Sequence, residues 1–465
     1  MDSHYPLVII GGGPAGLAAA TTATEHGITV ALFDEQPTLG GQIYRAIESV
    51  PSDRAKQLGK EYLRGKKLVD AFRQSKAHYF PDTQVWSLNK QREIGLLRNN
   101  KALIITADQV LVANGAMERP VPFPGWTLPG VMHAGAGQIL FKSAGIVPAD
   151  GVVLAGSGPL LLLLAWQYLH AGVDVKAMLD LTPMRNYLRA LPKLPRALIA
   201  HHYLTKGLAY QLDLKRAGIR TVYGVNNLHA RGGDSLESVS FQHRGKNETI
   251  ETDLLLTHFG VIPHIWLTQA AGCRHQWDES QQCWRPQHDE WGNTSIDGIL
   301  VAGDNAGIGG ARSAEHAGRL AALQTTWILG KMNLQERDKL AKNDRKWMRK
   351  DLHVRPFLEA FYHIPQKTLL ATPDDDTIVC RCEEVTAGQI RAAVANKHSD
   401  SNQVKFLTRC GMGPCQGRQC ANAVAHIVAV ASDKPIQKTD HYRGRPPVTP
   451  LSLGELATIS PETTE

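Results

Sequence analysis

The stretch Leu7-Val-Ile-Ile-Gly-Gly-Gly-Pro-Ala-Gly16 joins a short apolar run to a glycine-rich turn. Residues 7–10 are apolar and partly β-branched, which is typical of a buried parallel strand. The Ala-rich residues 15–26 predict a helix, which Gly27 is suited to end. Residues 28–33 predict a second strand. This order of strand, glycine turn, helix and strand indicates a doubly wound α/β domain that binds a dinucleotide.

The spacing Gly-x-Gly-x-x-Gly gives each glycine of this turn a role. Gly11 permits the tight turn, Gly13 lets backbone amides approach a pyrophosphate, and Gly16 lets the helix pack closely on the sheet. The phosphates would lie at the helix N-terminus, where free N–H groups and the helix dipole favour negative charge. Asp34 ends the second strand, as a ribose-binding acid does, and Glu35 is the neighbouring alternative. A turn-capping role is the non-functional interpretation of Asp34.

A second unit with the same pattern begins at Gly151. Residues 152–155 and 173–179 predict strands, and residues 159–171 predict a helix. Gly156 and Gly158 match the first two glycines of the motif, but Leu161 stands where the third belongs. A leucine there should push the helix away from the strand, so the predicted site of Gly156, Gly158 and Asp180 is doubtful. NAD(P), another adenine nucleotide and loss of binding all stay open.

Five of the seven cysteines lie in the last part of the chain. They form Cys380-x-Cys382 and Cys410-x4-Cys415, followed by Cys420. Four thiolates suffice for a 2Fe–2S cluster or a zinc ion, but Cys-x-Cys is cramped for zinc, which favours the cluster. We therefore expect Cys380, Cys382, Cys410 and Cys415 to be the metal ligands. Cys420 is either a fifth candidate or a core residue of a helix over residues 421–430.

Bulk properties narrow the class of protein. The 465 residues are enough for several domains, and the net charge of +7 is too diffuse to indicate a nucleic-acid-binding protein. No signal peptide or membrane-spanning segment is predicted, because the apolar runs are too short. We expect a cytoplasmic protein, in which the cysteines stay reduced and are available for metal or redox chemistry.

Three further segments resemble flavoproteins of the glutathione-reductase type. Gly40-Gly41-Gln42 follows the acid at Asp34, residues 112–116 resemble the Ala-Thr-Gly segment with Asn114 in place of Thr, and residues 298–304 resemble the second FAD motif. The resemblance implies FAD at the first turn, with Asp304 on the ribityl chain; a helix cap is the structural alternative for Asp304. The expected FAD-binding residues are Gly11, Gly13, Pro14, Ala15, Gly16, Asp34, Glu35, Gly41, Gln42, Ala113, Gly115, Gly303 and Asp304.

One signature of the disulfide reductases in that group is missing. The flavin region contains no Cys-x-x-Cys, and Cys273 and Cys283 are ten positions apart. Disulfide reductase activity is therefore not expected. Histidines such as His133, His258 and His316 have no partner that the sequence reveals, and none is assigned a catalytic role.

The cysteine region resembles a narrower family. Residues 379–385 and 409–420 resemble the bacterioferritin-associated-ferredoxin-like 2Fe–2S domain of the alpha subunits of multimeric amino-acid and opine dehydrogenases. Residues 118–131 and 156–161, including Leu161, also resemble these proteins. The resemblance implies two interleaved Rossmann-like domains in an α/β fold of the glutathione-reductase type, followed by a small α-rich cluster domain. We expect an FAD domain (1–150 and 290–335), a second dinucleotide domain (151–289), a basic linker (336–375), the cluster domain (376–431) and a C-terminal tail (432–465).

The resemblance also implies a division of labour. A separate FAD-containing beta subunit would oxidise a C–N bond of an amino acid or opine, and this chain would pass the electrons on through flavin and cluster to an electron acceptor. An FMN at a subunit interface and a small gamma subunit are further features that the family leaves open. Two alternatives remain: a standalone NAD(P)H-dependent flavin oxidoreductase, and a zinc-stabilised scaffold.

Overall fold

The N-terminal sheet has the strand order β3-β2-β1-β6-β5-β4, and β19 pairs with β6. Strand β1 (His4–Ile10) lies between β2 (Val30–Phe33) and β6 (Lys101–Val112), and both pairings are parallel, as is that of β19 (Ile299–Val301) with β6. The other strands are β3 (His78–Phe80), β4 (Thr83–Leu88) and β5 (Glu93–Arg98). Because β1, β2 and β19 run the same way, the segments that follow them meet at one edge of the sheet.

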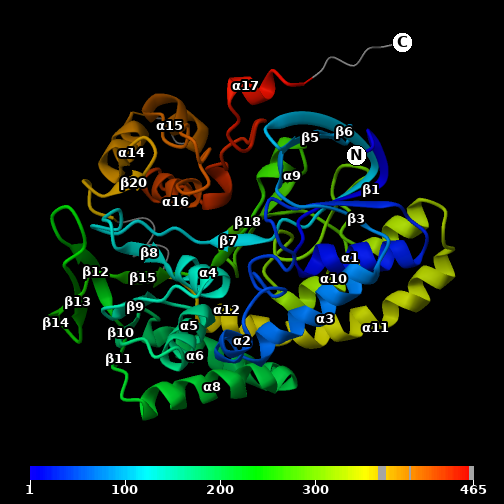
Figure 1. The fold of residues 1–465 in the computed structure, drawn as a ribbon. Coiled ribbons are helices and arrows are strands. Elements are labelled where there is room, and N and C mark those ends of the chain that lie inside the picture. Colours follow the sequence, from blue (N-terminus) through cyan, green and yellow to red (C-terminus); the bar gives the residue numbers. More distant parts are fainter. Residues whose placement is uncertain (365–372, 397–399, 460–465) are drawn as a thin grey trace.

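Helices cover this sheet on the side that holds the glycine turn. Helix α1 (Pro14–Glu25) packs on α10 (Ala311–Ile328) so closely that a Cβ atom on Gly318 would lie 2.1 Å from the carbonyl oxygen of Ala15. Helices α2 (Ser52–Leu58) and α3 (Lys60–Gln74) lie beside them (Figure 1). The small residues of α1 and α10 are therefore needed for the contact between the two helices.

A second parallel sheet has the order β11-β10-β9-β15-β8. Its central strands are β9 (Val152–Gly156), β10 (Val175–Asp180) and β15 (Leu255–His258), flanked by β8 (Val131–His133) and β11 (Thr221–Tyr223). Helices α4 (Ala134–Ala144) and α5 (Pro159–His170) pack on it, and an antiparallel meander covers the other face: β12 (Asn226–Arg231), β13 (Ser238–His243) and β14 (Lys246–Glu251). The chain enters and leaves this unit through β7 (Ala116–Glu118) and β16 (Val261–Pro263), which pair with each other.

Several helices and a hairpin complete this part of the molecule. Helical residues between β10 and β11 form α6 (Met184–Ala190), α7 (Leu194–Ala197) and α8 (His201–Arg216). After β16 come α9 (Trp266–Ala270) and the hairpin of β17 (His275–Asp278) and β18 (Cys283–Pro286). Residues expected to be a basic linker form α11 (Leu334–Leu352), which packs on α10 around Leu320 and Ala341, and α12 (Arg355–Phe361).

The cysteine-rich region is mostly helical, as predicted. A short hairpin of β20 (Ile378–Cys380) and β21 (Val385–Thr386) precedes α14 (Ala387–Ala395), α15 (Ser401–Thr408) and α16 (Ala421–Ala431). This region shares one apolar core with the first sheet, in which Val8 and Val112 belong to the same cluster as Val379 and Val424, and α9 contributes Trp266 and Leu267 to that core. The cluster domain and the N-terminal sheet are therefore one packed body.

The C-terminal tail returns to the N-terminal sheet. The Val448 amide donates to the Trp86 carbonyl oxygen at 2.8 Å. Beyond it, helix α17 (Leu453–Leu456) lies beside β6, and the Ala102 amide donates to Thr458 Oγ1 at 2.7 Å. These contacts fasten the far end of the cluster domain to the sheet.

The computed structural model describes residues 1–364, 373–396 and 400–459. Residues 365–372 of the predicted linker and residues 460–465 of the predicted tail lie outside the described residues. Within the described residues, no helix combines the length and apolar character that crossing a bilayer requires. The α/β class, the paired dinucleotide folds and the α-rich last domain are confirmed, whereas the domain limits stay predictions.

Candidate functional site: a dinucleotide turn and a cysteine cluster

The first glycine turn has the open backbone that a phosphate needs. A Cβ atom on Gly16 would lie 1.9 Å from the Gly11 carbonyl oxygen, so α1 can begin this close to β1 only with glycine at that position. In contrast, a Cβ atom on Gly13 would meet nothing nearer than the Gly41 Cα atom at 3.9 Å. The space in front of Gly13 is therefore free at the N-terminus of α1, where anions bind.

Asp34 lies beside the turn, and its neighbour Glu35 does not. Its Oδ2 atom accepts from the Gly12 amide at 2.6 Å and its Oδ1 atom from the Gln36 amide at 2.8 Å. The side chain is buried, and this burial raises its pKa to about 6. Glu35 is exposed. Of the two acids, only Asp34 is fixed at the edge of the turn.

The Gly40-Gly41-Gln42 segment packs against the same turn. The Gly40 amide donates to the Gly12 carbonyl oxygen at 2.9 Å. A Cβ atom on Gly41 would lie 2.8 Å from the Gly13 Cα atom. The segment therefore forms the wall that faces the phosphate position.

Residues after β6 and β19 close the other side. A Cβ atom on Gly11 would lie 2.5 Å from the Ala113 carbonyl oxygen. A Cβ atom on Gly303 would lie 3.0 Å from the Cβ atom of Ala15. Asp304 Oδ1 accepts from the amides of Gly309 and Gly310 at 2.9 Å each and so orders the loop before α10, but the N-cap residue of α10 is Gly310, so the helix-cap alternative for Asp304 is wrong. Gly115 lies in the same segment as Ala113.

Unpaired polar atoms test whether a flavin dinucleotide fits here. Asn114 Oδ1 and Asn305 Oδ1 are buried without a hydrogen-bond partner within the described residues, as are Ser313 Oγ and Arg312 Nε. Asn305 is held in place by its Nδ2 donation to the Val112 carbonyl oxygen at 2.8 Å. Buried polar atoms without partners are costly, and a polar ligand would satisfy them. The donor and acceptor set therefore fits FAD.

The second glycine turn is built differently. Gly158 begins α5 with a φ of 139°, whereas Gly13 begins α1 with a φ of −81°. Leu161 is buried in the same apolar core as Val152 and Leu154 of β9. The His258 ring occupies the space beside Gly158, where a Cβ atom would lie 2.9 Å from His258 Nε2. The turn therefore lacks the open space found at Gly13.

His258 is held in that position by Glu118. Its Nδ1 atom lies 2.6 Å from Glu118 Oε1, and Glu118 Oε2 accepts from the Gly135 amide at 2.7 Å. The His258 side chain is only 2% exposed. Sequence spacing does not reveal this contact, because Glu118 and His258 are far apart in the chain and meet only through the crossover segments in which β7 pairs with β16.

Asp180 lies at the end of β10, as predicted. Its Oδ1 atom accepts from the Thr182 amide at 2.8 Å, and burial raises its pKa. Burial raises the pKa values of Tyr187, Tyr223 and Tyr362, and Asp180 lies near enough to raise them further. The acid is thus surrounded by the chain's own aromatic side chains.

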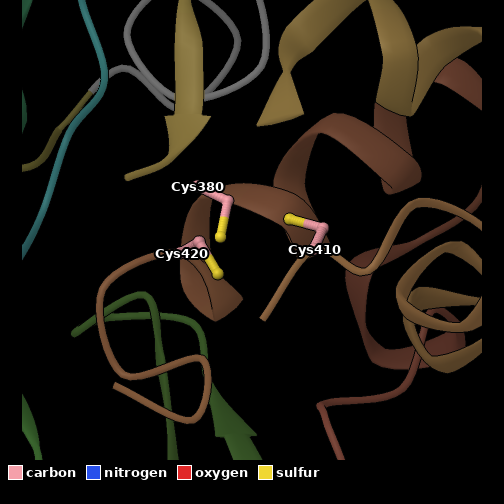
Figure 2. Close-up of side chains that lie close together, drawn as sticks. All are labelled: Cys380, Cys410 and Cys420. Atoms are coloured by element: carbon pink, nitrogen blue, oxygen red, sulfur yellow. The ribbon is translucent and has the colours of Figure 1, made fainter. Parts of the chain in front are cut away.

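Three cysteines converge in the last domain, and Cys420 is one of them. The sulfur atoms of Cys380, Cys410 and Cys420 all lie within 4.8 Å of one another, and all three side chains are buried (Figure 2). The thiols of Cys410 and Cys420 lower the pKa of Cys380 to about 2, and the Gly411 amide donates to Cys380 Sγ at 3.4 Å. This is the electrostatic setting of a thiolate that binds a metal.

Cys382 and Cys415 form a second, outer pair. The Cys415 thiol and backbone both influence the pKa of Cys382, whose net direction is upward because of burial. A Cβ atom on Gly413 would lie 2.3 Å from Cys382 Cβ, so the glycine lets the two loops approach. The five thiols therefore fall into an inner group of three and an outer pair. The sequence leaves Cys420 without an assigned role. Its position at the start of α16 is the feature that could have indicated it as a ligand.

The cysteine loop also contacts the link between the two dinucleotide units. Trp126 Nε1 donates to the Ile378 carbonyl oxygen at 2.6 Å, and the Arg381 guanidinium lies 5.3 Å from the centre of the Trp126 ring. Arg381 stands between Cys380 and Cys382. The segment containing Trp126 therefore positions the cysteine loop.

Two protein families match the chain. Residues 5–321 match the family described as pyridine nucleotide-disulphide oxidoreductase, and residues 378–429 match the BFD-like [2Fe-2S] binding domain. The opine oxidase A chain of Agrobacterium tumefaciens (strain Ach5) is 42% identical over 98% of this chain and 92% of its own length. Hydrogen cyanide synthase subunit HcnB of Pseudomonas protegens is 30% identical over 96% of both chains.

Solved structures agree on the fold. L-proline dehydrogenase from P. horikoshii superposes with a TM-score of 0.72 at 19% identity, covering 97% of this chain and 79% of that chain. Thioredoxin reductase of T. acidophilum has a TM-score of 0.52 at 21% identity, covering 70% of this chain and 99% of that chain. The chain is therefore a flavin oxidoreductase of the pyridine nucleotide-disulphide oxidoreductase family, in the branch of the opine oxidase A chains, and carries a BFD-like [2Fe-2S] domain.

Proposed function

We propose that this chain is the electron-transferring FAD and 2Fe–2S subunit of a heteromeric amino-acid or opine dehydrogenase. In this proposal a partner subunit with its own FAD oxidises the C–N bond, and this chain passes the electrons to an acceptor. The observation that carries it is the shared apolar core, which joins Ile10 and Val112 beside the glycine turn to Cys380, Cys410 and Cys420. Two redox sites in one packed body suit short-range electron transfer.

The chain's own residues have the task of holding the cofactors. Bound FAD can accept two electrons and release them singly, and a 2Fe–2S cluster carries one at a time. The turn from Gly11 to Gly16 would bind the diphosphate, Asp34 the ribose and Asp304 the ribityl chain. Gly41, Gln42, Ala113, Gly115 and Gly303 would form the walls.

The two groups of thiols suggest how a cluster would be divided. Each iron of a 2Fe–2S cluster binds two thiolates. Cys382 and Cys415 would serve one iron, and Cys380 with Cys410 the other, as the sequence predicts. The Cys420 sulfur lies within 4.8 Å of those of Cys380 and Cys410, and Cys420 is the alternative fourth ligand.

Single Cys→Ser variants of the full chain test this ligand set. We expect loss of iron, sulfide and visible absorbance in Cys380→Ser, Cys382→Ser and Cys415→Ser, and no loss in the buried control Cys273→Ser. Comparing Cys410→Ser with Cys420→Ser identifies the fourth ligand. Zinc without iron or sulfide in the purified wild-type protein would contradict the cluster.

An exposed apolar surface supports the existence of a partner. Met184 and Leu188 on α6 are 68% and 74% exposed, and Leu208 and Leu212 on α8 are 59% and 51% exposed. Contiguous apolar patches mark interaction surfaces, and we propose that these four side chains contribute to one. Relatives of this chain are named as subunits of opine oxidase and hydrogen cyanide synthase. We expect Leu188→Glu or Leu208→Glu to prevent co-purification of an amine-oxidising partner while leaving bound FAD unchanged.

The test of the whole proposal is reconstitution. The isolated chain should bind FAD but leave it oxidised in the presence of amino acids and opines, and the complex with its partner should bleach on adding the right substrate. Full turnover of an amino acid by the isolated chain would disprove the subunit role. A cytoplasmic location remains our prediction, and the family leaves an interfacial FMN and a small gamma subunit open.

The rival function, a standalone NAD(P)H-dependent flavin oxidoreductase, needs a nicotinamide site at the second turn. The His258 ring beside Gly158 and the buried Leu161 argue against a pyrophosphate there.

A further inference from the structure

A buried lysine behind the FAD wall has no carboxylate partner among the described residues. Lys142 on α4 is 3% exposed. Its ammonium group donates to the Gln42 carbonyl oxygen at 3.1 Å and to Gln138 Oε1 at 2.9 Å. In the part of the chain that the structure describes, these are its hydrogen-bond partners, and both are uncharged.

The amide partners of Lys142 are fixed in orientation. Gln138 Nε2 donates to Gln167 Oε1 at 2.8 Å, and Gln167 Nε2 donates to the Leu58 carbonyl oxygen at 3.0 Å. Gln138 and Gln167 are both buried. This chain of hydrogen bonds turns an oxygen atom of Gln138 toward Lys142, so the site is organised to hold an ammonium group.

A second buried cation, Arg45, also donates a hydrogen bond to Gln42. Arg45 is 8% exposed and donates to Gln36 Oε1 and, at 2.9 Å, to Gln42 Oε1. Its Nε atom is buried without a partner among the described residues. Asp34 and Glu35 lie near enough to influence the pKa of Arg45, but no described carboxylate forms an ion pair with it. Two buried cations therefore flank Gln42.

Buried charges are stable only when an opposite charge compensates them. Gln42 follows Gly41, which packs on Gly13 at the phosphate turn. Arg45 is the charged group that lies near enough to shift the pKa of Lys142, and Arg54 of α2 donates from Nη1 to the backbone carbonyl oxygen of Lys142 at 3.5 Å. Both are cations, so the described residues around Lys142 supply no compensation.

We propose that Lys142, assisted by Arg45, is the charge partner of the dinucleotide diphosphate at the first glycine turn. The proposal rests on FAD binding there, as argued above. Without the ligand, burial and the nearby Arg45 lower the pKa of Lys142 to about 7. A bound diphosphate restores the charged form, so binding above this pH draws a proton from solvent.

Proton uptake measures this directly. Calorimetric titration of the ligand-free full chain with FAD at pH 8, in two buffers of different ionisation enthalpy, should show uptake of about one proton per FAD. ADP, which carries the diphosphate, should show the same uptake, and adenosine should show none. If FAD binds without proton uptake, this inference is wrong while the proposed function stands. If FAD does not bind, the proposed function itself fails.

Variants separate charge from structure. Lys142→Arg should keep FAD affinity but lose proton uptake, because a guanidinium stays protonated. Lys142→Met should lose uptake and weaken FAD binding about tenfold or more, because the charge partner of the diphosphate is gone. Lys66→Met, at an exposed lysine of α3, is the control and should change neither. Unchanged uptake in Lys142→Met would overturn the assignment, and the wild-type titration decides it even if a variant misfolds.

Discussion

The chain contains the same strand-turn-helix motif twice, and the two copies differ in the third motif residue and in the space beside the second glycine. In the first copy Gly16 lets α1 approach within contact of Gly11, and the space before Gly13 stays open. In the second, Leu161 occupies the core and the ring of His258 lies beside Gly158. The first turn is therefore open where a diphosphate would bind, whereas the protein fills the second turn with the ring of His258.

The largest loss of stability and of FAD is expected when the third glycine of the first turn is replaced by leucine, the residue at that position in the second turn. Gly16→Leu would place side-chain atoms on the Gly11 carbonyl oxygen, so α1 must move. We expect the free energy of unfolding to fall by more than about 4 kcal/mol and FAD to be absent, as measured by thermal unfolding and flavin absorbance. Gly207→Ala, in the middle of α8 with open space around it, is the control and should be slightly stabilising. A Gly16→Leu protein that retains FAD would refute the steric argument.

Truncating the leucine of the second turn should cost less. Leu161→Ala removes a buried side chain and leaves a cavity, so we expect about 3 kcal/mol of destabilisation in chemical denaturation. FAD content should stay at the wild-type level, because the first turn is untouched. Loss of FAD together with this stability change would mean that the two turns are coupled.

The acids of the two copies should also differ. Asp34→Asn removes the charge that would accept ribose hydroxyls, and we expect FAD affinity to fall by about 1.5–3 kcal/mol. Because burial raises the pKa of Asp34 to about 6, wild-type affinity should weaken about tenfold between pH 7 and pH 5 as the carboxylate is protonated. Asp34→Asn should lack this dependence, and Asp180→Asn should retain it. Equilibrium titration with FAD across this pH range gives both results.

The smallest expected effect is none at all. Anaerobic addition of NADH to the FAD-loaded chain should leave the flavin absorbance unchanged, because His258 occupies the position that a pyrophosphate needs. Rapid bleaching would favour the standalone reductase and would mean that the second turn opens.

Sequence patterns predict those structural features whose residues are close together in the chain. The strands beside both turns and the acids at Asp34 and Asp180 follow from hydrophobic runs and glycine spacing, and the resemblance adds Asp304 and the cluster domain. Spacing leaves Cys420 undecided, because its sulfur meets those of Cys380 and Cys410 only when α16 packs against β20 and the loop after α15. His258 and Lys142 escape prediction for the same reason: each gains its neighbours from segments far away in sequence. Charge compensation and ring packing are properties of the folded chain, so no spacing rule reveals them.

The fastening of the last domain has a consequence for how electrons could travel. Trp126 holds one end of that domain through its hydrogen bond to the Ile378 carbonyl oxygen. The C-terminal tail holds the other end through the hydrogen bond from the Val448 amide to the Trp86 carbonyl oxygen. A domain that carries electrons by moving between donor and acceptor must detach and rotate. In contrast, this domain is bound to the rest of the chain at two points. The step inside the chain should therefore be insensitive to solvent viscosity, and the external acceptor must travel to the protein.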